Sequence, residues 1–113
     1  MATIDIRQEA TGLRIILHGN LSFQTVEALR GKFQGVLSAM DEAMPLILDF
    51  GDVEMVDSMG LKLVLGLYQS CEIQSRPLFL ENVSYQNGQV FKLCNLEERL
   101  NIRYRDNAPD TPS

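Results

Sequence analysis

The sequence contains few of the residues that build disulfide frameworks, metal sites or membrane anchors. It has two cysteines and one histidine in 113 residues, and tryptophan is absent. Cys71 and Cys94 form neither a C-x-x-C motif nor a closely spaced pair, so no zinc motif or disulfide scaffold is indicated, and both are expected to be small core residues. The longest apolar stretch, residues 61–68, is interrupted by Lys62 and Gly66 and falls far short of the roughly 20 residues that cross a bilayer. We therefore expect a soluble cytoplasmic protein with no direct membrane insertion.

Positive charge is also in short supply. Ten Lys and Arg residues against fifteen Asp and Glu residues give a formal net charge of -5, the wrong sign for a protein held to phosphate backbones, so nucleic acid is not an expected partner. A hydrophobic content of 45% is enough for one core, and 113 residues fit one domain. We expect residues 1–104 to form that domain. Residues 105–113, with two prolines and no apolar periodicity, are expected to be a flexible C-terminal tail.

The first third of the sequence changes from a period of two to a helical period. Apolar and polar residues alternate in residues 4–7 and 13–18, on either side of a turn at residues 10–12, which predicts a β-hairpin. From Ser22 onward, apolar residues recur every three or four positions. This spacing predicts an amphipathic helix, with Ser22 as its N-cap.

The remaining pattern alternates between short apolar runs and helical periodicity. It predicts, in order, a strand at 46–48, a loop at 51–56, a helix from 60 to about 74, a strand at 78–80, a turn at 86–88, a short helix at 90–94 and a last strand at 101–104. Strands separated by helices should lie parallel through right-handed crossovers, whereas the hairpin adds antiparallel pairing. The fold class is therefore α/β, a mixed β-sheet of four to five strands with helices packed beside it.

Two segments resemble enzyme motifs, but neither has the residue spacing that the motif requires. The Gly-Lys pair at residues 31–32 lacks the earlier glycine and the following Ser or Thr of a phosphate-binding loop. Ser58 followed by Gly60 resembles half of a nucleophile elbow, but Val56 stands where the first glycine belongs, and the single histidine, His18, lies upstream. We predict a protein that is not an enzyme, with no catalytic residues, no cofactor and no metal site, and we expect the acidic residues before the second helix to form a solvated loop.

Ser58 lies where the second long helix is predicted to begin. At about 100° per residue, small or polar residues form one stripe that should face solvent: Ser58, Lys62, Gly66 and Gln69. A phosphate on Ser58 would be tolerated at the positive end of the helix dipole, with Lys62 one turn away, and its charge would act on whatever docks there. The alternative interpretation is that Asp57 or Ser58 is only the N-cap of this helix, and the two interpretations are compatible.

Three segments, 46–50, 53–61 and 64–68, together resemble the signature of STAS domains, the anti-sigma factor antagonists. The similarity extends to residues 18–21 and 93–96 and so covers nearly the whole chain. The resemblance implies a small α/β domain that binds an ATP-using anti-sigma factor, a GHKL-type serine kinase. It also implies that the unphosphorylated form holds the anti-sigma factor and leaves the sigma factor free, whereas phosphorylation releases the partner until a serine phosphatase removes the phosphate.

The resemblance also assigns roles to particular residues. Ser58 would be the phosphorylated serine and Asp57 the acid beside it, and Gly60 would allow a close approach at the helix start. The residues expected to bind the partner are Asn20, Leu21, Ser22, Phe23, Asp57, Ser58, Met59, Gly60, Lys62 and Gln69. A second hypothesis is a cytoplasmic STAS subunit of an ABC-type lipid transporter, in which the serine acts in contact without phosphate.

Overall fold

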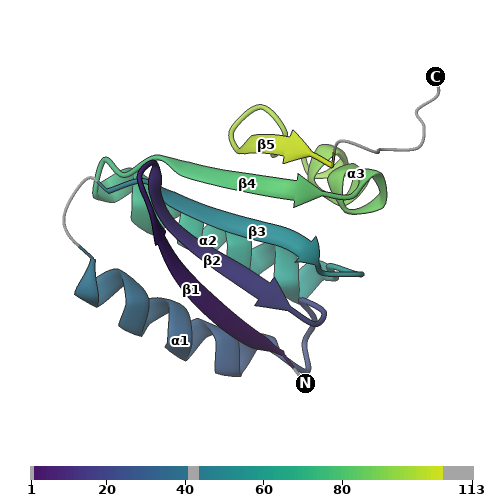
Figure 1. The fold of residues 1–113 in the computed structure, drawn as a ribbon. Coiled ribbons are helices and arrows are strands. Elements are labelled where there is room, and N and C mark those ends of the chain that lie inside the picture. The colour runs from purple at the N-terminus through teal and green to yellow at the C-terminus, as the bar shows by residue number, and fades with distance from the viewer. Residues whose placement is uncertain (1, 41–43, 106–113) are drawn as a thin grey trace.

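The computed structural model describes residues 2–40 and 44–105 and confirms the predicted fold class (Figure 1). The described chain forms five strands and three helices. In chain order these are β1 (Thr3–Glu9), β2 (Gly12–His18), α1 (Val26–Ala39), β3 (Leu46–Asp52), α2 (Ser58–Ile73), β4 (Leu78–Val83), α3 (Tyr85–Leu93) and β5 (Asn101–Tyr104).

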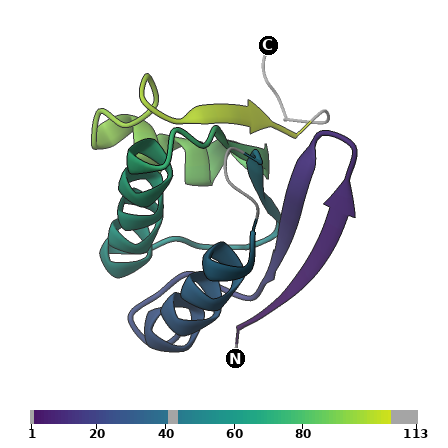
Figure 2. The ribbon, with the colours of Figure 1, turned by 90° about the vertical axis from the view of Figure 1, so that its left-hand side faces the viewer.

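The five strands form one mixed sheet in the order β1-β2-β3-β4-β5. The β1–β2 hairpin is antiparallel, and the other three strand pairs are parallel. Because successive parallel strands lie side by side and their connections have one hand, α1 and α2 lie on the same face of the sheet (Figure 2). The carboxyl ends of β2 and β3 therefore meet at one end of the molecule, next to the start of α2.

The core lies between the sheet and these helices. Inward side chains of the central strands are almost fully buried, among them Leu48 and Phe50 of β3 and Leu80 of β4. Phe91 of α3 packs edge to face against Phe50, with ring centroids 6.0 Å apart. α3 thereby closes the core at the end of the sheet where the candidate site lies.

The predicted start of α1 is wrong. Ser22 is not the N-cap and is only 7% exposed, and the helix begins at Val26 after Thr25. The Ser22 carbonyl accepts bonds from the Thr25 and Val26 N–H groups at 2.9 and 3.0 Å, so a separate turn precedes the helix. The Thr25 hydroxyl oxygen accepts a bond from the Ser22 N–H at 3.1 Å and stabilises this turn.

Other boundaries also differ from the sequence prediction. β3 continues to Asp52, into the predicted loop, and the predicted turn at 86–88 belongs to α3. α3 begins early because the Ser84 hydroxyl oxygen accepts a bond from the Asn87 N–H at 3.1 Å, and the buried Asn87 amide donates to the Val53 carbonyl at 3.1 Å. Cys94, expected in the core, is exposed just after this helix, whereas Cys71 is buried as predicted.

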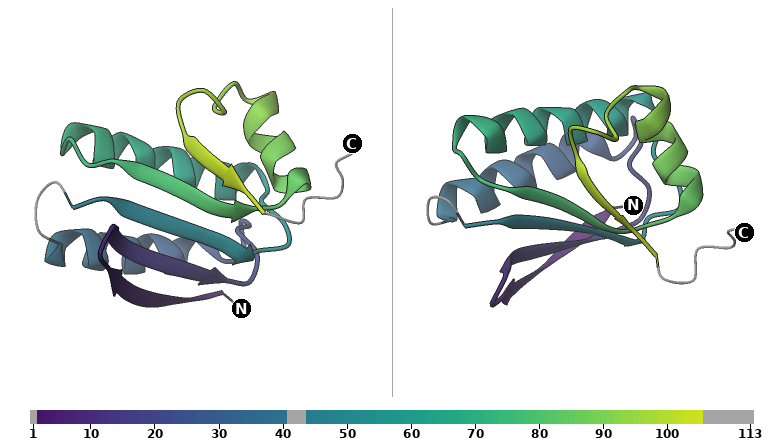
Figure 3. Two further views of the ribbon diagram at one scale, coloured as in Figure 1. Left: turned by 45° about the horizontal axis from the view of Figure 1, so that its top comes forward. Right: turned by 90° about the horizontal axis from the view of Figure 1, so that it is seen from above.

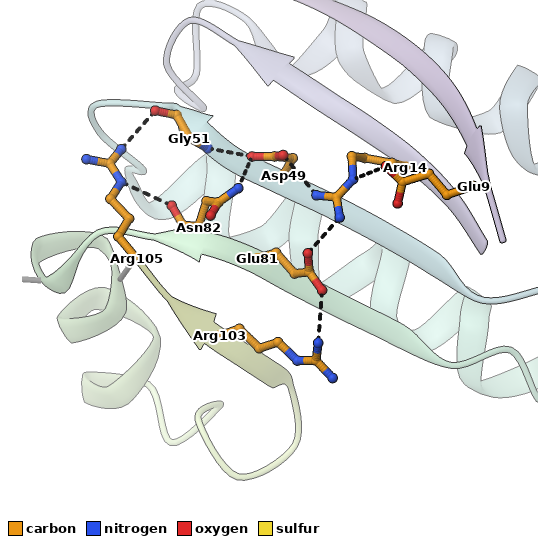
Figure 4. Close-up of polar contacts among 8 residues, drawn as sticks. All are labelled: Glu9, Arg14, Asp49, Gly51, Glu81, Asn82, Arg103 and Arg105. Atoms are coloured by element: carbon orange, nitrogen blue, oxygen red, sulfur yellow. Dashed lines mark hydrogen bonds and ion pairs between the residues drawn. The ribbon is translucent and has the colours of Figure 1, made fainter. Parts of the chain in front are cut away.

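The face of the sheet that α1 and α2 leave open carries an ion-pair network centred on Arg14 (Figure 4). The Arg14 guanidinium donates to Glu9 at 2.8 Å, to Asp49 at 2.9 Å and to Glu81 at 2.8 Å. These bonds raise the pKa of Arg14, with the Glu9 bond contributing most. Arg103 adds a longer pair to Glu81 at 3.3 Å. Charged side chains thus connect β1 to β5 across the sheet.

The described chain ends in contact with the sheet. The Arg105 N–H donates to the Val83 carbonyl at 3.1 Å, and its guanidinium donates to the Gly51 carbonyl at 2.9 Å and to the Asn82 carbonyl at 3.2 Å (Figure 4). The rest of the predicted tail, residues 106–113, lies outside the described residues. Among the helices of residues 2–40 and 44–105, none combines the length and apolar character needed to cross a bilayer.

Candidate functional site

The site is built on the N-cap of α2. The Asp57 carboxylate accepts bonds at Oδ1 from the Met59 N–H at 3.0 Å and from the Gly60 N–H at 2.9 Å. Its Oδ2 accepts a third bond, at 3.0 Å, from the N–H of Phe23 in the β2–α1 loop. These bonds, with Gly60 contributing most, lower the pKa of Asp57. Asp57, one of the two candidates from the sequence, is therefore the N-cap, and it also ties the helix to a second loop.

Backbone hydrogen bonds join the same two loops. The Asp57 N–H donates to the Leu21 carbonyl, and the Leu21 N–H donates to the Met55 carbonyl, both at 3.0 Å. Leu21 and Val56 form an isolated parallel bridge. The Asn20 side-chain oxygen adds a bond from the Met55 N–H at 3.1 Å. The β2–α1 loop and the β3–α2 loop are thus held together as a short extension of the sheet.

Gly60 lies where these loops come closest to α2. A β-carbon at this position would lie 2.2 Å from the Leu21 carbonyl oxygen and 2.7 Å from the Leu21 Cβ. Real β-carbons do not come this close to other atoms, so only glycine fits without a backbone shift. The close approach at the helix start that was expected at Gly60 is present, and Leu21 is the residue that makes it.

Ser58 is the first residue of α2 and is exposed. Its side chain makes no hydrogen bond to any other residue of the described chain. Two exposed apolar side chains lie on the loops that meet at Asp57: Phe23 is 67% exposed and Met55 is 48% exposed. A free hydroxyl therefore lies on a surface that also presents large apolar groups, which is the composition of a contact surface.

The other predicted contact residues fall into three groups. Phe23, Ser58, Lys62 and Gln69 are exposed, Asn20, Asp57 and Met59 are half-buried, and Leu21, Ser22 and Gly60 are buried. The stripe through Ser58, Lys62, Gly66 and Gln69 faces solvent, as predicted. The buried residues shape the surface without presenting side chains to it. Sequence reasoning missed Met55, whose signal was a large apolar side chain inside the predicted loop at 51–56.

His18, at the end of β2, connects β1 and β3 at the same end of the sheet. Its Nδ1 lies 2.6 Å from the Asp52 carboxylate and its Nε2 lies 2.8 Å from the Asp5 carboxylate. Both ring nitrogens face acceptors, so the imidazolium satisfies both bonds, and the pKa of His18 is raised, mainly by Asp52. Asp52 ends β3 and begins the loop that leads to Asp57, so this bond links the hairpin to the site.

A polar cleft of about 740 Å³ opens beside the two loops, at the carboxyl ends of β2 and β3. Its lining includes Asn20, Thr25, Asp52, Ser84 and Arg105. Across residues 2–40 and 44–105, no group of three or more His, Cys, Asp or Glu side chains is arranged to hold a metal ion. The geometry therefore identifies Ser58 as an exposed serine on a partly apolar surface whose two loops are joined by backbone hydrogen bonds.

This fold and this arrangement at the start of α2 define a class of protein. The model of the STAS domain family matches residues 3–106, and the chain belongs to this family.

Individual relatives match most of the length of the chain. The chain is 23% identical over 99 residues to the anti-sigma-B factor antagonist of Bacillus subtilis (strain 168), covering 88% of each chain. It also resembles the crystal structure of an anti-sigma factor antagonist from Mycobacterium paratuberculosis, with a TM-score of 0.78 and 17% identity over 91% of this chain and 86% of that one. The phosphorylated form of the Bacillus cell fate determinant SpoIIAA matches with a TM-score of 0.66 and 24% identity, over 96% and 97% of the two chains.

Proposed function

We propose that this protein is an anti-sigma factor antagonist whose binding to an anti-sigma factor is controlled by phosphorylation of Ser58. The unphosphorylated domain holds the anti-sigma factor, a GHKL-type serine kinase, and so frees the sigma factor. The kinase transfers a phosphoryl group from ATP to the Ser58 hydroxyl, and a serine phosphatase later removes it. One observation carries the proposal: the Ser58 hydroxyl is exposed and without a hydrogen-bond partner in the described chain, on the residue next to a fully engaged N-cap.

The surface around Ser58 supports protein binding. Phe23 and Met55 offer apolar side chains that a partner can desolvate, and buried apolar anchors supply much of the binding energy in protein interfaces. The hydrogen bonds that join the two loops fix the backbone of Phe23 and Met55 before binding, which reduces the backbone entropy lost on association. The unphosphorylated site is therefore preorganised for a partner.

The electrostatics of the cap explain why a phosphate would release that partner. A phosphoserine adds about -1.5 to -2 charges. At this helix start, the Met59 and Gly60 amides already donate to Asp57 and are not available to the phosphate. The new charge also lies on the residue next to an ionised carboxylate. On the described part of the domain only Lys62, one turn further along the helix, remains to offset the phosphate, and burying the charge against a partner would carry a desolvation cost.

The direct test is to recover the protein from its native cells with its bound partners and to analyse the Ser58 peptide by mass spectrometry. A GHKL-type kinase in the unphosphorylated complex, together with a phosphorylated Ser58 in the free pool, is the expected result. A transporter ATPase bound to protein with unmodified Ser58 would instead favour the transporter subunit.

Variants test the control step with purified components. Ser58→Ala should keep the fold and stay bound to the kinase in the presence of ATP. Ser58→Glu should weaken binding at least about tenfold, because it places a charge in the contact surface. Ser70→Glu is the matched control, since Ser70 is exposed on the same helix three turns further on. Equal affinities for Ser58→Ala and Ser58→Glu would contradict the proposal.

A further inference from the structure

β1 forms an edge of the sheet and has one unpaired side. Within residues 2–40 and 44–105, β1 pairs only with β2, and the ribbon views show its outer side uncovered (Figure 3). An exposed edge strand offers a row of backbone donors and acceptors to another strand. This edge runs over seven residues, Thr3–Glu9, which is longer than the average strand.

The hydrogen-bond pattern shows which residues offer their backbone groups outward. The Leu13 N–H donates to the Pro45 carbonyl at 2.9 Å and therefore points away from β1. Because backbone groups alternate in direction along a strand, the N–H and C=O groups of the intervening β2 residues, such as Arg14, point toward β1. Arg14 pairs with Arg7, so the odd-numbered residues of β1 are bonded to β2. The N–H and C=O groups of Ile4, Ile6 and Gln8 consequently point to the open side.

Side chains of β1 leave apolar surface exposed along this edge. Ile6, on the helix side of the sheet, is 52% exposed. It borders an apolar groove of about 270 Å³ between the hairpin and the C-terminal half of α1, lined by Ile6, Gln8, Leu13, Val36, Ala39 and Met40. A strand added to this edge would place its own apolar side chains beside this groove.

The other face of β1 carries alternating charge. Arg7 lies opposite Arg14 in the hairpin register and makes no ion pair with any residue that the structure describes. Asp5 uses its Oδ2 for His18 and keeps Oδ1 for another donor. An unpaired cation and a carboxylate with a free oxygen therefore lie two residues apart on the same face of the edge strand.

We propose that β1 is a self-association surface on which a second copy of this chain adds its own β1, antiparallel, about a twofold axis at Ile6. In this register Ile6 pairs with Ile6 of the second copy, Asp5 with its Arg7, Ile4 with its Gln8 and Thr3 with its Glu9. All seven residues pair, and the two Asp5–Arg7 contacts join opposite charges on one face. Ile4 and Ile6 of each copy cover the apolar groove of the other, and the two sheets become one of ten strands.

Neighbouring registers are less favourable. An axis at Asp5 would place two Asp5 carboxylates directly opposite each other, and an axis at Arg7 would do the same with two Arg7 side chains. A shift by one residue would put the side chains of the two strands on opposite faces of the sheet. Because a single strand pair buries little surface, the association should be weak and concentration-dependent.

Charge exchange tests this register with the full-length protein. Arg7→Glu places a carboxylate opposite Asp5, and Asp5→Arg places a guanidinium opposite Arg7, so each variant repels its own copies. In an equimolar mixture, Asp5 of the first variant faces Arg7 of the second, and the two introduced side chains face each other with opposite charges, so the mixture should associate. The measurement is sedimentation equilibrium from about 10 µM to about 1 mM, a range suited to weak interfaces. We expect each variant alone to associate at least about tenfold more weakly than the wild type and the mixture to recover.

Controls separate this pairing from a general effect of charge. Lys32→Glu and Glu98→Arg make comparable charge reversals at exposed positions outside β1 and should leave association unchanged. In NMR amide-exchange experiments, the amides of Ile4, Ile6 and Gln8 should gain protection as the wild-type concentration rises. A wild type that stays monomeric over the whole range, a mixture that fails to recover, or protection that bypasses these amides would overturn the proposal.

Discussion

Gly60→Ala tests whether the close contact between α2 and the β2–α1 loop supports the site. The added Cβ would lie 2.2 Å from the Leu21 carbonyl oxygen, 2.7 Å from the Leu21 Cβ and 2.8 Å from the Leu21 carbonyl carbon. All three atoms are backbone or adjacent to it, so no side-chain rotation relieves the clash. The loop must move away from the helix by about 1 Å to restore an ordinary contact distance of roughly 3.4 Å or more.

The expected cost follows from that movement. Overpacking a close contact costs about 1–3 kcal/mol. The same shift strains the bond from the Asp57 N–H to the Leu21 carbonyl and the bond from the Phe23 N–H to Asp57, each worth about 1 kcal/mol. Alanine returns about 1 kcal/mol as a better helix former than glycine. We expect the free energy of unfolding to fall by about 2 kcal/mol, which lowers Tm by roughly 10 °C in a domain of this size.

The assay is urea unfolding of the two variants Gly60→Ala and Gly66→Ala beside the wild type. Gly66 lies on the same helix but is exposed, and a Cβ there would meet no atom within 4 Å. Gly66→Ala should therefore raise the free energy of unfolding by about 0.5–1 kcal/mol. A Gly60→Ala protein as stable as the wild type would refute the reasoning, as would equal losses at both positions.

Three further predictions concern the charged groups. The folded pKa of His18 is raised, so the stabilisation that its ion pairs give the fold is complete below the unfolded pKa of about 6.5 and is lost as the pH rises through the folded pKa. NMR titration of this single histidine should show a pKa above 6.5. Asp52→Asn should lower this pKa more than Asp5→Asn does. The folded pKa of Asp57 is lowered, so the stabilisation from its ionised carboxylate is present above about pH 4 and is lost as the pH falls through the folded pKa. Asp57→Ala should lower the free energy of unfolding by about 1 kcal/mol at pH 7, whereas Asp57→Asn should keep most of the cap and lose the acid dependence that Asp57 contributes. An Asp57→Asn protein whose acid unfolding matches that of the wild type would contradict this prediction. Arg14→Met leaves three carboxylates without their shared cation and should lower the free energy of urea unfolding by about 2 kcal/mol. Arg103 is more exposed, so Arg103→Met should lower it by less than about 1 kcal/mol. Equal losses for the two variants would show that the network is not centred on Arg14.

Local signals in the sequence were sufficient to predict most of the fold. The alternation in residues 4–7 and 13–18 predicted the hairpin, because side chains on a strand alternate between a buried and an exposed face. The solvent-facing stripe of α2 followed from helical periodicity alone. The sequence narrowed the N-cap of α2 to Asp57 or Ser58, and the bonds from amides two and three residues away show that it is Asp57. Interactions confined to one turn or one strand depend on neighbouring residues, so the sequence states them directly.

Tertiary structure decided the features that join distant segments. Ser22 has the right chemistry for an N-cap, yet its position beside Leu21 in the joined loops buries it and leaves Thr25 to precede the helix. The third bond of Asp57 reaches Phe23 across 34 residues, and Arg14 reaches Glu81 across 67. The need for glycine at position 60 comes from Leu21, and the open side of β1 comes from the strand order. Sequence patterns report the environment of each residue but not which distant residue supplies it, because strand order and loop packing are set by the whole core.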